Sequence, residues 1–188
     1  MSYNNKYIAW GITLVAVGGI LLLNRRKQTT PSLINNGMSL DYRTTNKKMP
    51  RGYRNNNPLN IRISSERWKG KVLPNTDGEF EQFQDIAYGY RAALATMRTY
   101  ITKYGLDSVS KIISRWAPAK DNNNTLGYIR DVCNFTGLTP DTVVDRNDKD
   151  TLTKMAYGMS LVENGNTEYT RMLGLPNMEL INEGWNRL

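Results

Sequence analysis

The segment from Asp85 to Tyr104, DIAYGYRAALATMRTYITKY, carries the clearest structural signal in the sequence. Its apolar residues recur every three or four positions, which places them on one face of an α-helix. They are Ile86, Tyr90, Ala93, Leu94, Met97, Ile101 and Tyr104. Asp85 is well placed to cap the first turn, and Gly105 to end the helix. We therefore expect the folded part of the chain to be built around this helix.

Most of the sequence beyond Gly105 has the same helical periodicity. Capping residues, glycines and prolines mark where these helices begin and end. We expect helices from Val109 to Trp116, from Asn124 or Thr125 onward, from Asp150 or Thr151 to Asn164, and after Pro176.

Two short segments before the first helix favour β-structure. Residues Ile61–Ile63 and Glu79–Phe83 are separated by WKGKVLPNTDG, which is rich in turn residues. We expect them to form a small hairpin. The predicted class is therefore α+β, a mostly helical domain with a small β-hairpin, as in lysozymes.

The run YIAWGITLVAVGGILLL, residues 7–23, contains no charged residue and is flanked by Arg25, Arg26 and Lys27. Its length and flanks predict one transmembrane helix, whereas a cleaved signal peptide would need a small-residue cleavage site at that place. The polar segment that follows is typical of a flexible tether. We expect an anchor at residues 1–24, a tether at 25–50 and a soluble domain at 51–188. The flanking charges would leave this domain on the cytoplasmic side.

The overall charge of +8 is distributed unevenly. Residues 1–50 hold seven basic residues and one acid, for a net +6, and residues 51–188 hold 18 and 16, for a net +2. The excess positive charge therefore belongs to the anchor and tether, where it would face anionic lipid headgroups. This distribution argues against nucleic acid as a partner.

The chain contains no histidine, and Cys133 is its one cysteine. Histidine-dependent zinc hydrolases and Ser-His or Cys-His nucleophile systems are therefore excluded, and no cofactor or metal is expected. An enzyme of this composition would rely on carboxylates. Glycoside cleavage is the commonest hydrolytic reaction that does so.

Glu163 is the first candidate for a catalytic carboxylate. In TLTKMAYGMSLVENG, residues 151–165, it continues the apolar helix face that begins at Leu152. Partial burial and the negative end of the helix dipole would both raise its pKa, as a general acid requires. A glutamate that turns into solvent at a frayed helix end is an equally good interpretation of the pattern.

Glu79 and Glu81 are the fallback candidates for the acid. They alternate around Phe80, so a strand would place both on one face, where one could line a cleft. Two solvated acids on an exposed hairpin are the simpler interpretation.

Candidate sugar-binding residues are concentrated in RGYRNNNPLNIR, residues 51–62. Asparagine amides can bind sugar hydroxyls, arginines can bind carboxylates of wall peptides, and aromatic rings can stack on sugars. The candidates are Arg54, Asn56, Asn57, Asn60, Arg62, Trp68, Tyr88 and Trp116. A turn formed by the asparagines and core packing of each aromatic ring are the structural alternatives.

Six motifs together resemble a family of phage and prophage proteins described as virion structural proteins or virion-associated lysozyme-like enzymes. They lie, in order, between residues 50 and 165: RGYRNNNPLNIR, WKGK, EFEQFQD, YGYRAALATMRTY, SKIISRWAPAKDNNNTLGYI and LVENG. An ordered set of motifs is more specific than any one of them.

The stretch from NNNPLNIR to the following helix also resembles bacterial glucosaminidases and lytic transglycosylases. In those enzymes the catalytic glutamate precedes the asparagine-rich turn, whereas here LVENG follows it by about a hundred residues. The resemblance therefore implies a circularly permuted arrangement, in which Glu163 supplies the acid.

These observations favour a membrane-anchored, virion-associated enzyme that cleaves the glycan strands of peptidoglycan during phage genome entry. Its expected partners are peptidoglycan, a lipid membrane through residues 7–23, and other virion proteins. The expected location is the virion membrane of a membrane-containing phage. An inactive structural virion membrane protein and a peptidoglycan-binding module are the alternatives.

Overall fold

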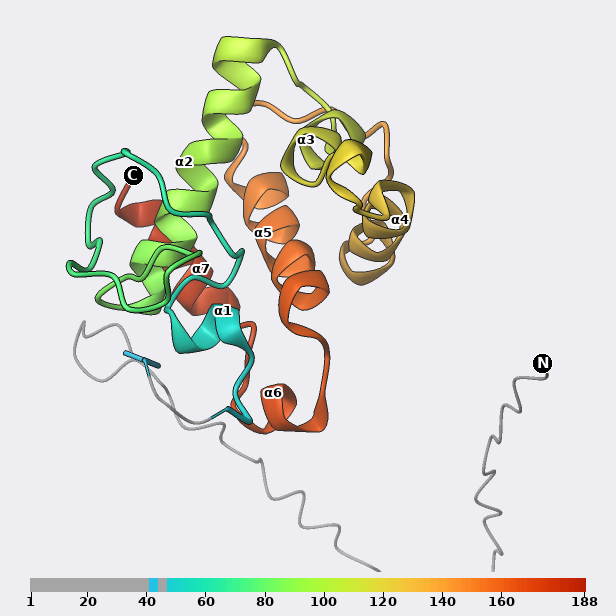
Figure 1. Ribbon diagram of the computed structural model, residues 1–188. Coiled ribbons are helices and arrows are strands. Elements are labelled where there is room, and N and C mark those ends of the chain that lie inside the picture. The colour runs from blue at the N-terminus through green and yellow to red at the C-terminus, as the bar shows by residue number, and fades with distance from the viewer. Residues whose placement is uncertain (1–40, 44–46) are drawn as a thin grey trace, which may run out of the picture. The chain divides into compact units, whose positions relative to one another are not determined.

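The computed structural model describes residues 41–43 and 47–188. The expected transmembrane helix at residues 7–23 lies outside this part of the chain. Within it, no helix is both long enough and apolar enough to cross a bilayer. The helices, shown in Figure 1, are α1 Arg51–Arg54, α2 Ile86–Tyr104, α3 Val109–Trp116, η1 Ala119–Asp121, α4 Thr125–Thr136, α5 Lys149–Asn164, α6 Glu168–Met172 and α7 Met178–Asn186.

The ends of the helices follow from local side-chain chemistry. The Asp85 carboxylate accepts a hydrogen bond from the backbone N–H of Tyr88 at 3.0 Å and caps α2. Gly105 ends α2 in the left-handed region, with φ of 65°. Both predictions are confirmed. Helix α5 begins earlier than expected, because Asp148 rather than Asp150 or Thr151 caps it, through the backbone N–H of Thr151 at 3.0 Å.

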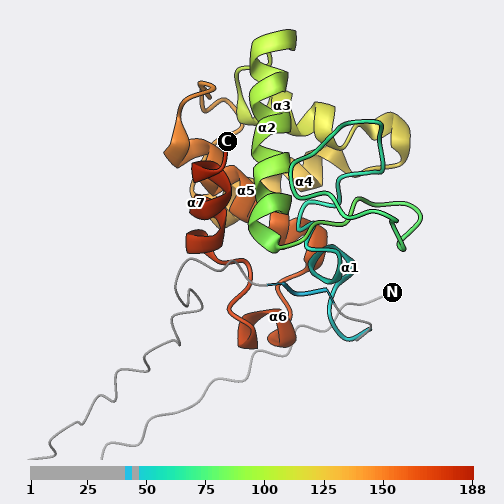
Figure 2. The ribbon, with the colours of Figure 1, turned by 90° about the vertical axis from the view of Figure 1, so that its left-hand side faces the viewer.

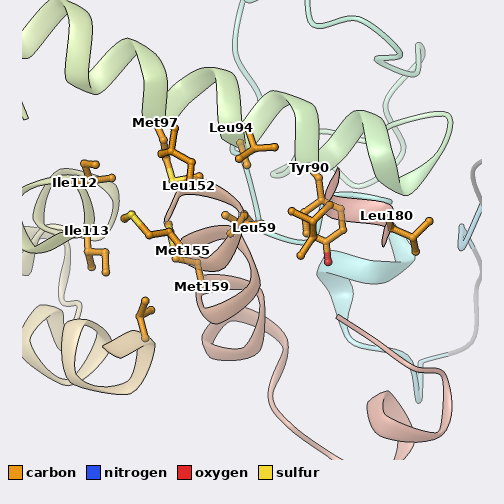
Figure 3. Close-up of a cluster of buried hydrophobic side chains, with 14 of the residues drawn as sticks. Leu59, Tyr90, Leu94, Met97, Ile112, Ile113, Leu152, Met155, Met159 and Leu180 are labelled. Atoms are coloured by element: carbon orange, nitrogen blue, oxygen red, sulfur yellow. The ribbon is translucent and has the colours of Figure 1, made fainter. Parts of the chain in front are cut away.

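The core lies between α2, α3, α5 and α7 (Figure 3). Helix α2 packs against α7 and α5, and α5 packs in turn against α4 (Figures 1 and 2). Many of the largest side chains in this core come from the helices. They include Tyr90, Leu94, Met97, Ile112, Ile113, Leu152, Met155, Met159 and Leu180. Their burial is the main force that holds the helices together.

The expected β-hairpin is wrong, and with it the α+β class. Within the described residues the chain forms helices and no β-strand, only isolated bridges such as Arg62 to Phe80 and Lys71 to Phe83. The segment 79–84 divides its backbone bonds among three partners, one of which is Asn55 O, bound by the Phe83 N–H at 3.0 Å. Glu81 N–H donates to Ile61 O, whereas Gln84 N–H donates to Gly70 O, both at 2.8 Å. None of these pairings is long enough for a ladder.

Residues 62–84 instead form an irregular segment, which we call the strap. Its anchor is the buried carboxylate of Glu81, which pairs with the Lys71 ammonium at 2.8 Å and accepts the Ser64 backbone N–H at 3.0 Å. Phe83 is buried at its end. The strap is therefore held by its side chains rather than by a sheet.

The residues just before α1 also contact the domain. Met49 is buried, and the backbone N–H of Tyr42 donates to the Asn56 side chain at 2.8 Å. The described part of the expected tether thus lies against the folded domain.

Candidate functional site

A groove of about 470 Å³ opens where the start of the strap faces the ends of α3, α4 and α5. Its wall combines carboxylates, amides and aromatic rings. We call it the Glu163 groove; it is lined by Asn60, Ile61, Arg62, Phe80, Thr96, Tyr100, Trp116, Ala117, Asp121, Asn123, Tyr128, Val162 and Glu163. Such a mixture suits a polar ligand that also has flat apolar faces, as a sugar has.

Glu163 lies in the last turn of α5, partly exposed to this groove. Both oxygens of its carboxylate accept hydrogen bonds from side chains. Asn60 Nδ2 lies 2.9 Å from Oε2, and the Tyr128 hydroxyl lies 2.9 Å from Oε1. The carboxyl group is therefore fixed in orientation from both sides, although its partners are 103 and 35 residues away in the sequence.

Burial raises the pKa of Glu163 above its ordinary value. The hydrogen bonds from Asn60, Tyr128 and Trp116 act against this effect, but burial outweighs them. The negative end of the α5 dipole also disfavours a charge there. A partly exposed carboxyl group with a raised pKa can hold a proton and donate it to a ligand in the groove.

The position of Asn60 depends on tight backbone packing. Asn60 adopts φ of 50°, in the left-handed region that asparagine tolerates. Its Oδ1 and that of Asn164 both lie against Gly52 of α1, where a Cβ atom would collide with each of them. Asn164 is held by hydrogen bonds from its Nδ2 to Pro58 O at 2.7 Å and Ser160 O at 2.9 Å. Helix α1 thus sets the distance between the asparagine-rich turn and α5.

The structure brings four of the predicted site residues together in the groove: Asn60, Arg62, Trp116 and Glu163. Sequence reasoning missed others that line it, among them Tyr100, Asn123 and Tyr128. Tyr128 lies within the motif DNNNTLGYI, in the helix expected from Asn124 or Thr125 onward. Its contact with Glu163 depends on how α4 packs on α5, which no local pattern encodes.

Asn56 and Asn57 are buried, and their side-chain amides donate hydrogen bonds to other parts of the protein. Asn56 Nδ2 donates to Phe83 O at 3.0 Å and to Asp41 Oδ1 at 2.7 Å. Asn57 Nδ2 donates to Glu81 O and Ile61 O, both at 2.9 Å. These two residues bind the strap to the asparagine-rich turn and do not line the groove.

The other predicted binding residues also lie outside the Glu163 groove. Arg54 donates from Nε to Met49 O at 3.0 Å and lines a separate hollow beside Asp77. Tyr88 lies beneath Gly70 and the Arg187 guanidinium, whose Cζ is 4.4 Å from the ring centre. Trp68 is half-buried in the strap.

The two fallback carboxylates differ in environment. Glu81 is fully buried in its ion pair with Lys71. The Glu79 side chain is 45% exposed and forms ion pairs with Arg51 and Arg62, both at 2.8 Å. These arginines hold the pKa of Glu79 below its ordinary value, so it is poorly suited to carry a proton. Neither residue lines the groove.

No family model matches the sequence. A phage protein, however, shares a large part of it, and this similarity defines the class: the chain is a phage protein. The relative is Protein P5 of Pseudoalteromonas phage PM2, which is 41% identical over 126 residues, a stretch that covers 64% of this chain and 74% of the relative. The chain belongs to the family of that protein.

Proposed function

We propose that this phage protein is a virion component that cleaves the glycan strands of peptidoglycan, with Glu163 as the general acid. The observation that carries the proposal is a single one. A carboxyl group whose pKa is raised by burial lies at the edge of an open groove, held by hydrogen bonds to both of its oxygens. This is the arrangement that protonation of a glycosidic oxygen requires.

In the proposed reaction, protonated Glu163 gives its proton to the glycosidic oxygen as the bond from that oxygen to the anomeric carbon breaks. The acetamido oxygen of the same sugar attacks the anomeric carbon and forms a cyclic intermediate. The Glu163 carboxylate then takes a proton from water or from the C6 hydroxyl of the sugar. The oxygen that loses this proton attacks the anomeric carbon and opens the ring of the cyclic intermediate. Water gives a hydrolysed end and the C6 hydroxyl gives a 1,6-anhydro end, and Glu163 is protonated again in either case.

The groove supplies groups of the kind that sugar binding needs. Tyr100 and Trp116 present aromatic edges and faces, with ring centres 6.4 Å apart. Asn60 and Asn123 supply amides. The Arg62 side chain at the rim is 74% exposed and can reach a wall-peptide carboxylate, although it also forms an ion pair with Glu79. Together they favour a peptidoglycan strand over an uncharged glycan.

The location that fits this activity is the membrane of a virion. The charge-free run at residues 7–23 supports it, and the basic residues on its flank suit anionic headgroups. Flotation of full-length protein with liposomes through an alkaline carbonate wash tests this location. Release of the protein into the soluble fraction would contradict it.

The test of the activity uses the full chain in a mild neutral detergent with purified peptidoglycan, with released fragments identified by mass spectrometry. Wild type should release muropeptides, and Glu163→Gln should lose at least about a hundredfold in rate. Asp121→Asn is the matched control, because Asp121 is an exposed carboxylate of the same groove. We expect it to retain most of the activity.

Each result has a definite meaning. Equal release by wild type and Glu163→Gln would remove Glu163 from the mechanism. Loss of muropeptide release in Asp121→Asn alone would identify Asp121 of η1 as the acid instead. Retention on peptidoglycan without release would identify a binding module, and neither retention nor release would leave a structural role in the virion.

A further inference from the structure

A second hollow of about 270 Å³ lies on α2, away from the Glu163 groove. Three arginines line it: Arg91 and Arg98 from α2 and Arg146 from the loop before α5. At about 100° per residue, Arg91 and Arg98 fall on the side of α2 opposite Thr96 and Tyr100, which face the groove. The two sites share no residue.

Two of the three arginines are held in place by neutral partners. Arg91 Nε donates to the backbone oxygen of Arg187 at 2.9 Å. Arg98 donates to Asn147 Oδ1 at 3.4 Å, and its Cζ lies 5.5 Å from the centre of the Trp185 ring. These contacts order the guanidinium groups without neutralising them.

No carboxylate side chain lines this hollow, and none of the three arginines forms an ion pair within residues 41–43 and 47–188. Arg187, a close neighbour, pairs with Asp85 at 2.9 Å and has a raised pKa. Burial instead lowers the pKa of Arg91. Leu188 at the end of the chain also lines the hollow, but among the described residues it forms no ion pair with the arginines, and three guanidinium groups leave an excess of positive charge there. The hollow is therefore complementary to an anion.

We propose that the hollow lined by Arg91, Arg98 and Arg146 binds a phosphate group, as free phosphate or as the headgroup of an anionic phospholipid. Three guanidinium groups match the charge and the several acceptor oxygens of a phosphate better than those of a single carboxylate. The hollow is large enough to admit such a group. A phosphate bound there would tie α2 to the loop that leads into α5.

Calorimetric titration of the full chain in neutral detergent at low ionic strength tests the proposal. The probes are inorganic phosphate, dihexanoyl phosphatidylglycerol, dihexanoyl phosphatidylcholine and acetate. Wild type should bind at least one of the first two probes, and Arg98→Gln with Arg146→Gln should weaken that binding about tenfold or more. Melting curves without phosphate check that the double variant folds. Arg146→Gln alone should also weaken binding, and it should fold as wild type does because Arg146 is exposed.

The matched control removes Arg67 and Lys69, two exposed basic residues of the strap, by replacement with glutamine. It changes the net charge equally and should alter the affinity less than twofold. Binding of inorganic phosphate supports a free anion as the ligand, and binding of phosphatidylglycerol alone supports a lipid headgroup. The proposal would be overturned by equal binding of phosphatidylcholine or acetate, by equal affinity in the double variant, or by no binding of either phosphate probe.

Discussion

At the scale of single residues, the protonation of Glu163 links stability to pH. Its pKa is raised in the folded state, so the group favours folding below its unfolded pKa, and this contribution is lost as pH rises through the folded pKa. Glu163→Gln removes the ionisable group. We expect the melting temperature of the variant, relative to wild type, to rise between about pH 4 and pH 8. A difference that stays constant across this range would show that the carboxyl group is not perturbed by burial.

Tyr128 should affect the pKa of the same carboxyl group. Its hydroxyl donates to Glu163 Oε1 at 2.9 Å and lowers the pKa of the carboxyl group. Tyr128→Phe removes that donor and keeps the ring, so the pKa should rise further. If Glu163 is the acid, the alkaline limb of the pH profile of muropeptide release should move to higher pH. Tyr104→Phe, on an exposed ring of α2, should leave the limb in place. If Tyr128→Phe leaves the alkaline limb of the pH profile in place, Tyr128 does not affect the pKa of the catalytic acid.

At the scale of elements, the strap depends on one buried ion pair. Glu81→Gln would leave the Lys71 ammonium without its charge partner and weaken the contact with the Ser64 N–H. Breaking such a pair from one side costs about 3 kcal/mol, less where the remaining charge can reach water. We expect lower thermal stability and faster proteolytic cleavage within residues 62–84. Glu66→Gln, an exposed strap carboxylate, should change neither. Equal cleavage of the Glu81 and Glu66 variants would mean that other contacts hold the strap.

The elements that the sequence predicted correctly are those whose signals are local. Apolar spacing and caps define α2 and α3, because a helix face and its first turn are determined by neighbours within four residues. Helices α1 and α6 were missed, since four or five residues are too short to show a period. The hairpin prediction failed because strand pairing depends on partners that are distant in the sequence. Residues 79–84 have strand-like composition, but their backbone bonds go to three separate segments.

The candidate site follows the same rule at a longer range. The helix end at Glu163 was apparent from its pattern, but its hydrogen bonds to Asn60 and Tyr128 join segments far apart in the chain. Composition alone also could not separate groove-lining from buried asparagines in the run from Asn55 to Asn60. The difference between Asn57 and Asn60 arises from the turn, which directs one amide to the strap and the other to α5.

At the scale of the whole molecule, the Glu163 groove exists only while the helices stay packed, because α2, α3, α4 and α5 each contribute to its wall. Met155, fully buried on α5 in the common core, tests this dependence (Figure 3). Met155→Ala should lower the free energy of unfolding by about 2–5 kcal/mol through lost contacts and a cavity. Leu126→Ala, at a position 81% exposed, is the control and should have little effect.

Because one core connects the helices, tryptophan fluorescence and far-ultraviolet circular dichroism should report one coincident unfolding transition in the Met155 variant. Activity should then fall with the folded fraction, while the pH profile of the protein that remains folded should match wild type. Separate transitions, with fluorescence changing before helix content, would instead show that part of the domain unfolds independently of the remaining helices.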